Sequence, residues 1–243
     1  MTIVIAHRGA SAYAPENTLK AFALAADMGA EMSELDVICT SDGKLVVFHD
    51  DTTGRWEQTD RDVRGITYAD MQSLDIRGER VPLLAEVLEL ARTRGMRLNV
   101  ELKHAGVAGP VLAAIHDARM TDAVIISSFE PLALHEVRAA DARIPLAYLM
   151  GSDTWHPLTR LREFWPMPAL KQYGCQAWHP YRALPGIAVS IAAVRRAGYA
   201  VNVWTVNDEA EMRRLALLHV DGIITDKPDV ARSLIASLPP AGH

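Results

Sequence analysis

The chain has 243 residues, of which 49% are hydrophobic and 23% are charged. This composition is ordinary for a soluble globular protein and is sufficient for a large core. A formal net charge of −5 argues against nucleic acid or an anionic membrane as the main partner, although a local group of positive side chains would still suit a small anionic substrate.

Short apolar runs alternate with longer amphipathic stretches along the chain. The apolar runs are typical of buried strands and cover 2–6, 33–37, 97–102, 123–127, 144–150, 175–179, 200–205 and 220–225. Helical patterns lie between most of them, at 16–29, 83–95, 107–120, 131–141, 186–198 and 208–219. Eight strands that alternate with helices favour an α/β protein, a (β/α)₈ TIM barrel. We expect a single barrel domain over residues 1–243, because such barrels often reach about 250 residues.

Two segments interrupt this alternation. Asp42 and Gly43 lie between apolar runs just after the second strand, a pattern that predicts a hairpin turn. The polar segment 51–80 follows, and we expect it to form a short insertion at the mouth of the barrel. Three prolines interrupt the segment 152–174, so its helix is the least regular of the set.

The cysteines and the first residues bear on location. Cys39 and Cys175 lie far apart and form no paired metal-binding motif, so we expect reduced, structural thiols. The start of the chain lacks the basic region and apolar length of a signal peptide, and no stretch approaches the roughly 18 apolar residues of a membrane helix. We therefore expect a cytoplasmic protein without stable membrane association, present as a monomer or homodimer.

Many polar and ionisable residues come at the ends of the predicted strands. Enzymes with this barrel place their active site at the carboxyl ends of the strands, so these side chains are candidates for one site. They are His7, Arg8, Glu34, Asp36, Glu101, Lys103, Ser127, Ser128, His179, Trp204, Thr205, Thr225 and Asp226.

Three carboxylates among them form a candidate metal site. Glu34 and Asp36 are two residues apart on one strand, so both face the same side, and they would repel each other unless a cation lay between them. Glu101 ends the next strand and completes an all-oxygen set, which suits Mg²⁺ or Ca²⁺. Alone, the Glu-x-Asp pattern would more often be two exposed carboxylates that bind nothing. With Glu101 and Lys103 one strand later, a metal site is the better interpretation.

Two histidines are candidates for acid–base catalysis. His7 follows the first strand and His49 follows the hairpin after the second, and these points are neighbours in a barrel. A pair of imidazoles can divide the work, one as base and one as acid. Either histidine alone would more often be a loop or packing residue, but as a pair beside three carboxylates we interpret them as catalytic.

Positive and aromatic side chains are candidates for substrate binding. Arg8 and Lys103 supply fixed positive charge that suits phosphate oxygens, and Arg8 could also form an ion pair with Glu16. Glu16 itself would be favourable in the first turn of a helix. Trp204 is placed in the substrate pocket, although a tryptophan packed inside the barrel is nearly as good an interpretation.

The order of the motifs resembles the glycerophosphodiester phosphodiesterase family. The resemblance runs from Ala6 to Asp229 through AHRGASAYAPENTLKAF, GAEMSELDVICTSDGKLVVFHDDT, VPLLAEVL, NVELK, VWTVND and GIITDKPD. It implies a barrel enzyme that hydrolyses glycerophosphodiesters to glycerol 3-phosphate and an alcohol.

The resemblance also assigns roles to residues. It implies that His7 and His49 are the acid–base pair and that Arg8 and Lys103 contact the phosphate. The divalent cation, Mg²⁺ or Ca²⁺, would be held by the three carboxylates Glu34, Asp36 and Glu101. The nucleophile is left open between water and the 2-hydroxyl of the substrate.

Two other functions stay open. The first is a lysophospholipase D-like phosphodiesterase, which would need an apolar, membrane-facing rim, and the sequence gives no strong sign of one. The second is a phosphate-ester-binding protein without chemistry, which would lack a histidine or a metal carboxylate. The sequence lacks none of these.

Overall fold

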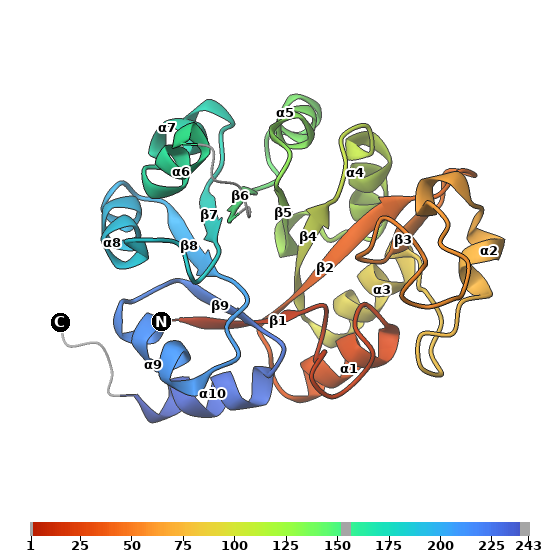
Figure 1. Cartoon of the computed structure of the whole chain (residues 1–243), viewed down its shortest axis with the longest axis horizontal. Helices are drawn as coiled ribbons and strands as arrows, with labels where there is room; N and C mark the ends of the chain where they lie inside the picture. The colour runs from red at the N-terminus through yellow and green to blue at the C-terminus, as the bar shows by residue number, and fades with distance from the viewer. Residues whose placement is uncertain (1, 152–156, 239–243) are drawn as a thin grey trace.

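A computed structural model describes residues 2–151 and 157–238. Eight parallel strands close into a barrel in which β1 pairs with both β2 and β9 (Figure 1). The strands are β1 (Ile3–His7), β2 (Met32–Cys39), β4 (Arg97–Leu102), β5 (Val124–Ser128), β6 (Leu146–Met150), β7 (Ala177–Pro180), β8 (Ala200–Val203) and β9 (Gly222–Thr225). The predicted (β/α)₈ TIM barrel is therefore confirmed.

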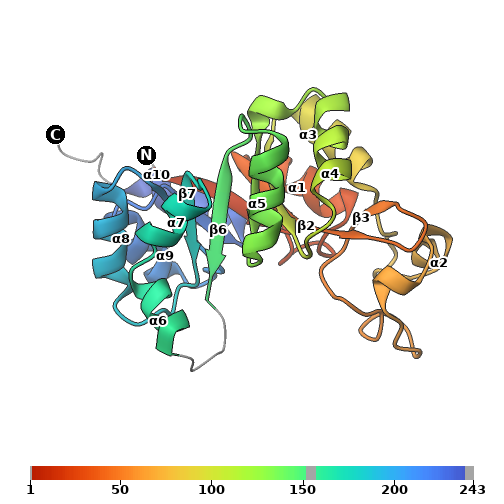
Figure 2. The same ribbon diagram turned by 90° about the horizontal axis from the view of Figure 1, so that it is seen from above.

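Helices surround the barrel (Figures 1 and 2). They are α1 (Leu19–Asp27), α3 (Leu84–Arg94), α4 (Ala108–Asp117), α5 (Pro131–Ala140), α6 (Pro157–Phe164), α7 (Met167–Gln172), α8 (Ile187–Arg196), α9 (Glu209–Leu217) and α10 (Pro228–Ser237). Helix α10 was not among the predicted helices, and it begins at Pro228, within the motif GIITDKPD that was quoted for the family resemblance. None of these helices has the length and apolar character needed to cross a membrane.

Prolines divide the irregular segment after β6 into two short helices. Pro157 begins α6, and Pro166 directly precedes α7. A proline is tolerated at a helix start because the first amide groups have no partner within the helix. His156, whose role the sequence left open, lies outside the described residues.

The hairpin after β2 is present as predicted. The short strand β3 (Leu45–Val47) pairs antiparallel with β2, and Gly43 in the turn has a φ of 76°. The segment 51–80 then carries a short 3-10 helix (Val63–Gly65) and α2 (Tyr68–Gln72). It was expected to be a polar excursion, yet it contributes buried apolar residues to a small separate cluster with the hairpin. That cluster comprises Ile38, Val46, Phe48, Val63, Met71, Leu74, Ile76 and Val81.

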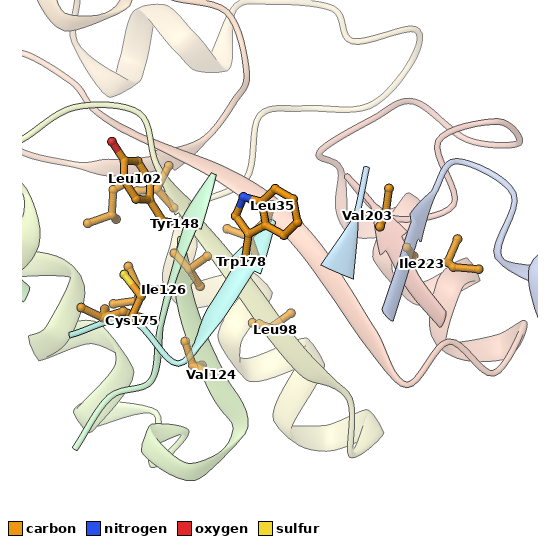
Figure 3. Packing of buried hydrophobic residues seen from close by; sticks show 14 of the residues in the cluster. Leu35, Leu98, Leu102, Val124, Ile126, Tyr148, Cys175, Trp178, Val203 and Ile223 are labelled. Carbon is orange, nitrogen blue, oxygen red and sulfur yellow. The ribbon is translucent and has the colours of Figure 1, made fainter. Parts of the chain in front are cut away.

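The main core lies between the barrel and its helices. Successive residues of a strand face opposite sides of the sheet, so Leu35 and Val37 of β2 join the core while Glu34 and Asp36 face the barrel interior. Figure 3 shows Leu35, Leu98, Ile126 and Trp178 in this core. Burying one such side chain stabilises the fold by about 1.5–3 kcal/mol. A slip of one residue would turn these groups into the barrel interior and the carboxylates toward the helices, so core packing fixes which side chains enter the barrel.

Candidate active site

The predicted site residues converge at the carboxyl end of the barrel. Strand register sets Glu34 beside His7 and Asp36 beside Glu101. A cavity of about 170 Å³ opens there, lined by His7, Arg8, Glu34, His49, Asn99, Glu101, Lys103, Phe129, Leu149, Trp204 and Ile224. Seven of the eight predicted residues line this cavity, and the eighth, Asp36, is buried beside it with 1% exposure. The space exceeds that of a single water, about 30 Å³ in the liquid.

Three carboxylates form a buried cluster beside this cavity. Glu34, Asp36 and Glu101 each offer an oxygen within 4.8 Å of the others. Burial and the charges of the other two hold the pKa of Glu34 well above its usual range. Burial and the charge of Asp36 raise the pKa of Glu101 to about 7. These pKa values reflect negative charge that the protein does not fully neutralise.

Two cations partly compensate the cluster. Arg8 Nε lies 3.2 Å and Lys103 Nζ lies 3.5 Å from the carboxylate of Asp36, and Lys103 also lies 3.0 Å from Glu101. Burial opposes ionisation of Asp36, but the charges of Arg8 and Lys103 lower its pKa to about 2. Three carboxylates against two cations leave the buried group short of positive charge. An all-oxygen donor set with this deficit fits a hard divalent cation.

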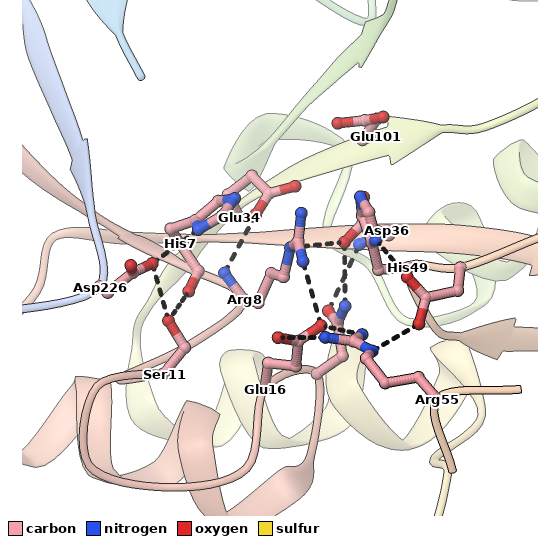
Figure 4. Close-up of polar contacts among 12 residues, drawn as sticks. His7, Arg8, Ser11, Glu16, Glu34, Asp36, His49, Arg55, Glu101 and Asp226 are labelled. Atoms are coloured by element: carbon pink, nitrogen blue, oxygen red, sulfur yellow. Dashed lines mark hydrogen bonds and ion pairs between the residues drawn. The ribbon is translucent and has the colours of Figure 1, made fainter. Parts of the chain in front are cut away.

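The first histidine is held by a carboxylate from the other end of the chain (Figure 4). His7 Nδ1 and Asp226 Oδ1 are 2.7 Å apart, and Asp226 also accepts hydrogen bonds from Ser11 and Asn207. Burial opposes ionisation of Asp226, but the hydrogen bond and charge of His7 lower its pKa to about 2. Because an ionised carboxylate only accepts, His7 Nδ1 carries the proton, and Nε2 is left for the cavity.

The second histidine is held in the same manner. His49 Nδ1 lies 2.8 Å from Asp50 Oδ1, and Arg55 Nε donates to the other oxygen of Asp50 at 2.6 Å. Burial lowers the pKa of His49, as do the charges of Arg8 and Lys103, although Asp36 opposes them. Each imidazole is therefore oriented by a carboxylate at Nδ1, the arrangement that fixes a tautomer in catalytic histidines.

Glu16 joins the two sides of the site. It accepts from Arg8 at 3.0 Å and from Arg55 at 2.6 Å, so the predicted ion pair between Arg8 and Glu16 is confirmed. The expectation that Glu16 lies in the first turn of a helix is wrong. Helix α1 begins at Leu19, after Thr18 accepts a hydrogen bond from the backbone of Ala21 as its N-cap. The helix begins after Thr18 and not at Glu16 because the threonine hydroxyl accepts a hydrogen bond from one of the first backbone amides, which have no partner within the helix.

Gly9 sets the path of the chain between the first strand and this helix. Its φ is +80°, and a Cβ there would come within 2.6 Å of the carbonyl carbon of Ala21. A larger residue would therefore clash with the backbone of α1, as well as adopting an unfavourable conformation. The glycine lets the loop carry His7 and Arg8 past the helix start and into the site.

One side of the cavity is aromatic and apolar. Trp204 lines the cavity and donates through Nε1 to the carbonyl of His179 at 2.8 Å. Phe129 meets Trp204 edge-on, with ring centroids 5.5 Å apart. The structure thus places Trp204 in the pocket, as predicted. Phe129 was not predicted, although its position directly after the Ser127–Ser128 strand end was a usable signal.

Other histidines lie apart from this cavity. His179, one of the strand-end candidates from the sequence, is fully buried, and burial lowers its pKa to about 3. Its Nε2 pairs with the amide of Asn202 at 2.8 Å. His104 and His116 pair with Asp51 and Asp141.

Three partners of the site were missed from the sequence. Asp226 was recognised as a strand-end residue without a role, and Asp50 was seen only as part of a motif. Asn17 donates to Asp36 at 2.9 Å from the PENT sequence that precedes α1. Their strand-end or loop positions were visible, but the contacts of Asp226 and Asn17 with distant segments were not, and neither was the direction of the Asp50 side chain beside His49.

Comparisons with known proteins agree with one another. The sequence model of the glycerophosphoryl diester phosphodiesterase family matches residues 7–230. A glycerophosphodiester phosphodiesterase from Caldanaerobacter subterraneus subsp. tengcongensis is 33% identical, over 96% of this chain and 98% of its own. A solved structure from Silicibacter pomeroyi aligns with a TM-score of 0.89 and 29% identity, covering 97% of this chain and 93% of that one. An Oleispira antarctica phosphodiesterase, solved with its product sn-glycerol-3-phosphate, aligns with a TM-score of 0.83 and 29% identity over 98% of each chain.

Proposed function

The chain belongs to the glycerophosphoryl diester phosphodiesterase family, and we propose that it hydrolyses glycerophosphodiesters to sn-glycerol 3-phosphate and an alcohol. The strongest support from the structure is one cavity lined by two histidines, each with a carboxylate at Nδ1, beside three clustered carboxylates. The product bound in the Oleispira antarctica relative supports the choice of substrate.

Glu34, Asp36 and Glu101 would hold one divalent cation, Mg²⁺ or Ca²⁺. When bound, such a cation stabilises negative charge on the phosphoryl oxygens. Arg8 and Lys103 line the same cavity, and their N–H groups not taken up by Glu16, Asp36 and Glu101 can donate to the phosphate. Fixed donors of this kind act where charge develops during the reaction.

His7 and His49 would move the protons. One imidazole takes a proton from the nucleophile through Nε2, and the other gives a proton to the leaving alkoxide. Asp226 and Asp50 orient the two rings and stabilise an imidazolium when it forms. The same geometry serves water or the substrate 2-hydroxyl as nucleophile, since either group needs a base within hydrogen-bond reach.

Trp204 would contact the non-reacting part of the substrate. Its ring and that of Phe129 are in edge-to-face contact and form an apolar part of the cavity wall. Such a wall excludes water and so strengthens the electrostatic interactions inside the site.

We also propose that residues 1–243 form one domain. The insertion shares its small apolar cluster with Ile38 and Val46 of the β2–β3 hairpin, so its packing depends on the barrel. A cytoplasmic location, a small-molecule substrate as the partner, and a monomer or homodimer remain predictions from the sequence.

One feature of the surface favours the lysophospholipase D-like alternative. Leu158, Leu161 and Trp165 are 67%, 61% and 51% exposed, and their spacing sets them on one face of α6 and its following turn. Arg162 on the same face is also exposed. A helix with an outward apolar face beside a basic residue suits the interface of a lipid aggregate.

The substrate classes can be separated by their products. The enzyme is incubated with glycerophosphocholine, glycerophosphoethanolamine or lysophosphatidylcholine, and glycerol 3-phosphate and lysophosphatidic acid are quantified. The proposal expects glycerol 3-phosphate from the first two at a much higher kcat/KM than any lysophosphatidic acid. Faster turnover of lysophosphatidylcholine would favour the alternative, and no product from any substrate would contradict both.

A further inference from the structure

Asn99 forms part of the cavity wall just below the carboxylate cluster. It lies on β4, two residues before Glu101, so both side chains face the barrel interior. The strand register sets it directly beside Glu34 of β2. It lines the cavity and is fully buried.

The amide of Asn99 has no partner in the protein. Neither Nδ2 nor Oδ1 makes a hydrogen bond within residues 2–151 and 157–238. The chain has three other asparagines, and each is paired: Asn17 with Asp36, Asn202 with His179 and Asn207 with Asp226. A buried amide left unpaired on both atoms is destabilising, and in a binding cavity this arrangement is typical of a group that meets a ligand.

The chemistry of the amide narrows the choice of ligand. Asn99 presents a donor and an acceptor side by side. Phosphate oxygens need donors only, and Arg8 and Lys103 already supply these in the same cavity. A hydroxyl group both donates and accepts, so it can satisfy the two amide atoms in turn.

We propose that Asn99 binds a free hydroxyl of the glycerol moiety and thereby selects glycerol-based phosphodiesters. This inference rests on the proposed function and deepens it, because the hydroxyls distinguish glycerol from other alcohols esterified to the same phosphate. A site that hydrogen-bonds a hydroxyl discriminates against ligands that lack it, since its own polar groups are then left unpaired.

The test measures binding of product analogues, which requires no chemistry. Wild type and Asn99→Ala are titrated by calorimetry, with Mg²⁺ or Ca²⁺ present, against sn-glycerol 3-phosphate, 2-hydroxypropyl phosphate and 3-hydroxypropyl phosphate. The two analogues lack the terminal and the central hydroxyl, respectively. We expect wild type to bind one analogue about tenfold more weakly than the parent. In Asn99→Ala, that ratio should fall to about one.

Two results would overturn the inference. Wild type binding all three phosphates equally would show that no hydroxyl is recognised. Equal weakening of all three by Asn99→Ala would show that the amide acts on the cation or the phosphate, or only on the structure. Glycerophosphocholine turnover by wild type separates the two proposals. If wild type turns over this substrate but Asn99→Ala has the same binding ratio as wild type, only the inference about Asn99 is contradicted. If wild type turns over no glycerophosphodiester, the proposed function is contradicted.

Asn202 offers a matched control. It is also an asparagine facing the barrel interior, but it lines a different cavity with Arg97, Ala177 and Ala200, residues at the amino ends of the strands. Asn202→Ala should leave the binding ratio unchanged. If Asn99→Ala does not fold, Asn99→Ser is used instead. The serine hydroxyl keeps a donor and an acceptor, but the side chain is shorter. The binding ratio should therefore lie between the wild-type value and one, the value without discrimination.

Discussion

His7 and Asp226 are 219 positions apart in the chain, yet their side chains meet at 2.7 Å. The contact follows from closure of the barrel, because β1 pairs with β9 and both strands end at the same rim. It gives a candidate catalytic histidine a fixed orientation that no local sequence could supply. The carboxyl group of Asp226 should therefore matter for rate far more than for folding.

Asp226→Asn should lower kcat by about 10²–10⁴-fold. The amide keeps the shape of the side chain but no longer stabilises an imidazolium, and it permits the wrong tautomer of His7. KM should change much less than kcat. Steady-state kinetics with glycerophosphocholine checks this result.

Asp229→Asn is the matched control for Asp226→Asn. Asp229 lies three residues later and accepts from the exposed Tyr13 at 2.7 Å, away from the cavity. Its replacement should leave kcat within about twofold, as expected for a surface substitution. Equal losses of kcat in the two variants would mean that Asp226 affects the rate only through the stability of this segment.

His7→Ala and His49→Ala should each reduce kcat/KM by about 10²–10⁴-fold. Both rings line the cavity, and in each the carboxylate takes up Nδ1, so Nε2 is the nitrogen left for proton transfer. His116→Ala removes a histidine that pairs with Asp141 outside the cavity and should retain wild-type activity. Near-normal turnover by either of the first two variants would remove that residue from the mechanism.

The buried His179 predicts a pH dependence of stability. Its folded pKa is about 3, below the value of about 6.5 in an unfolded chain. The unfolded state therefore takes up a proton as the pH falls through 6.5, while the folded state does not, so the free energy of unfolding decreases between pH 6.5 and 3. Between pH 7.0 and 5.5 this residue should account for a loss of about 1 kcal/mol.

His179→Gln isolates that contribution. Glutamine does not titrate and can still pair with Asn202. Urea unfolding of both proteins at pH 7.0 and 5.5 should give a smaller pH-dependent loss in the variant, because the carboxylates common to both proteins cancel. If the free energy of unfolding falls equally in wild type and variant, His179 takes up its proton in the folded protein as readily as in the unfolded chain.

Gly9→Ala should destabilise the fold by roughly 1–3 kcal/mol or more. The new Cβ would meet the backbone of α1, and the positive φ adds conformational strain. Gly43→Ala carries the same backbone strain at φ +76° with no atom within 4 Å, so the difference between the two variants measures the clash. A difference of zero in denaturant unfolding would show that the loop relaxes freely.

The barrel was predictable because its strands are short apolar runs that alternate with helical patterns, and eight such units favour a closed parallel sheet. The insertion was harder, since Val63, Met71 and Ile76 are scattered through a polar segment without a helical or strand period. Their spacing does not predict burial, because these side chains are buried only by packing against the β2–β3 hairpin.

The site also has a part that the sequence predicts and a part that it does not. Residues at strand ends, such as His7 and Glu101, could be placed because topology brings strand ends together. The carboxylates that orient the two histidines could not be assigned, because a hydrogen bond depends on side-chain direction: Asp226 is 219 positions from His7, and Asp50, although adjacent to His49, could point either way. Asn99 was hidden for another reason: within the NVELK motif it looks like a structural strand residue, and only the absence of any partner among the described residues marks it out.

The central claim is that a divalent cation at Glu34, Asp36 and Glu101 supports phosphodiester hydrolysis. The most direct test measures glycerol 3-phosphate release from glycerophosphocholine before and after EDTA treatment, with Mg²⁺ or Ca²⁺ added back. We predict that EDTA abolishes release and that one of the two metals restores it, while Asp36→Asn needs a much higher metal concentration for the same rate. Full activity in EDTA would contradict the account.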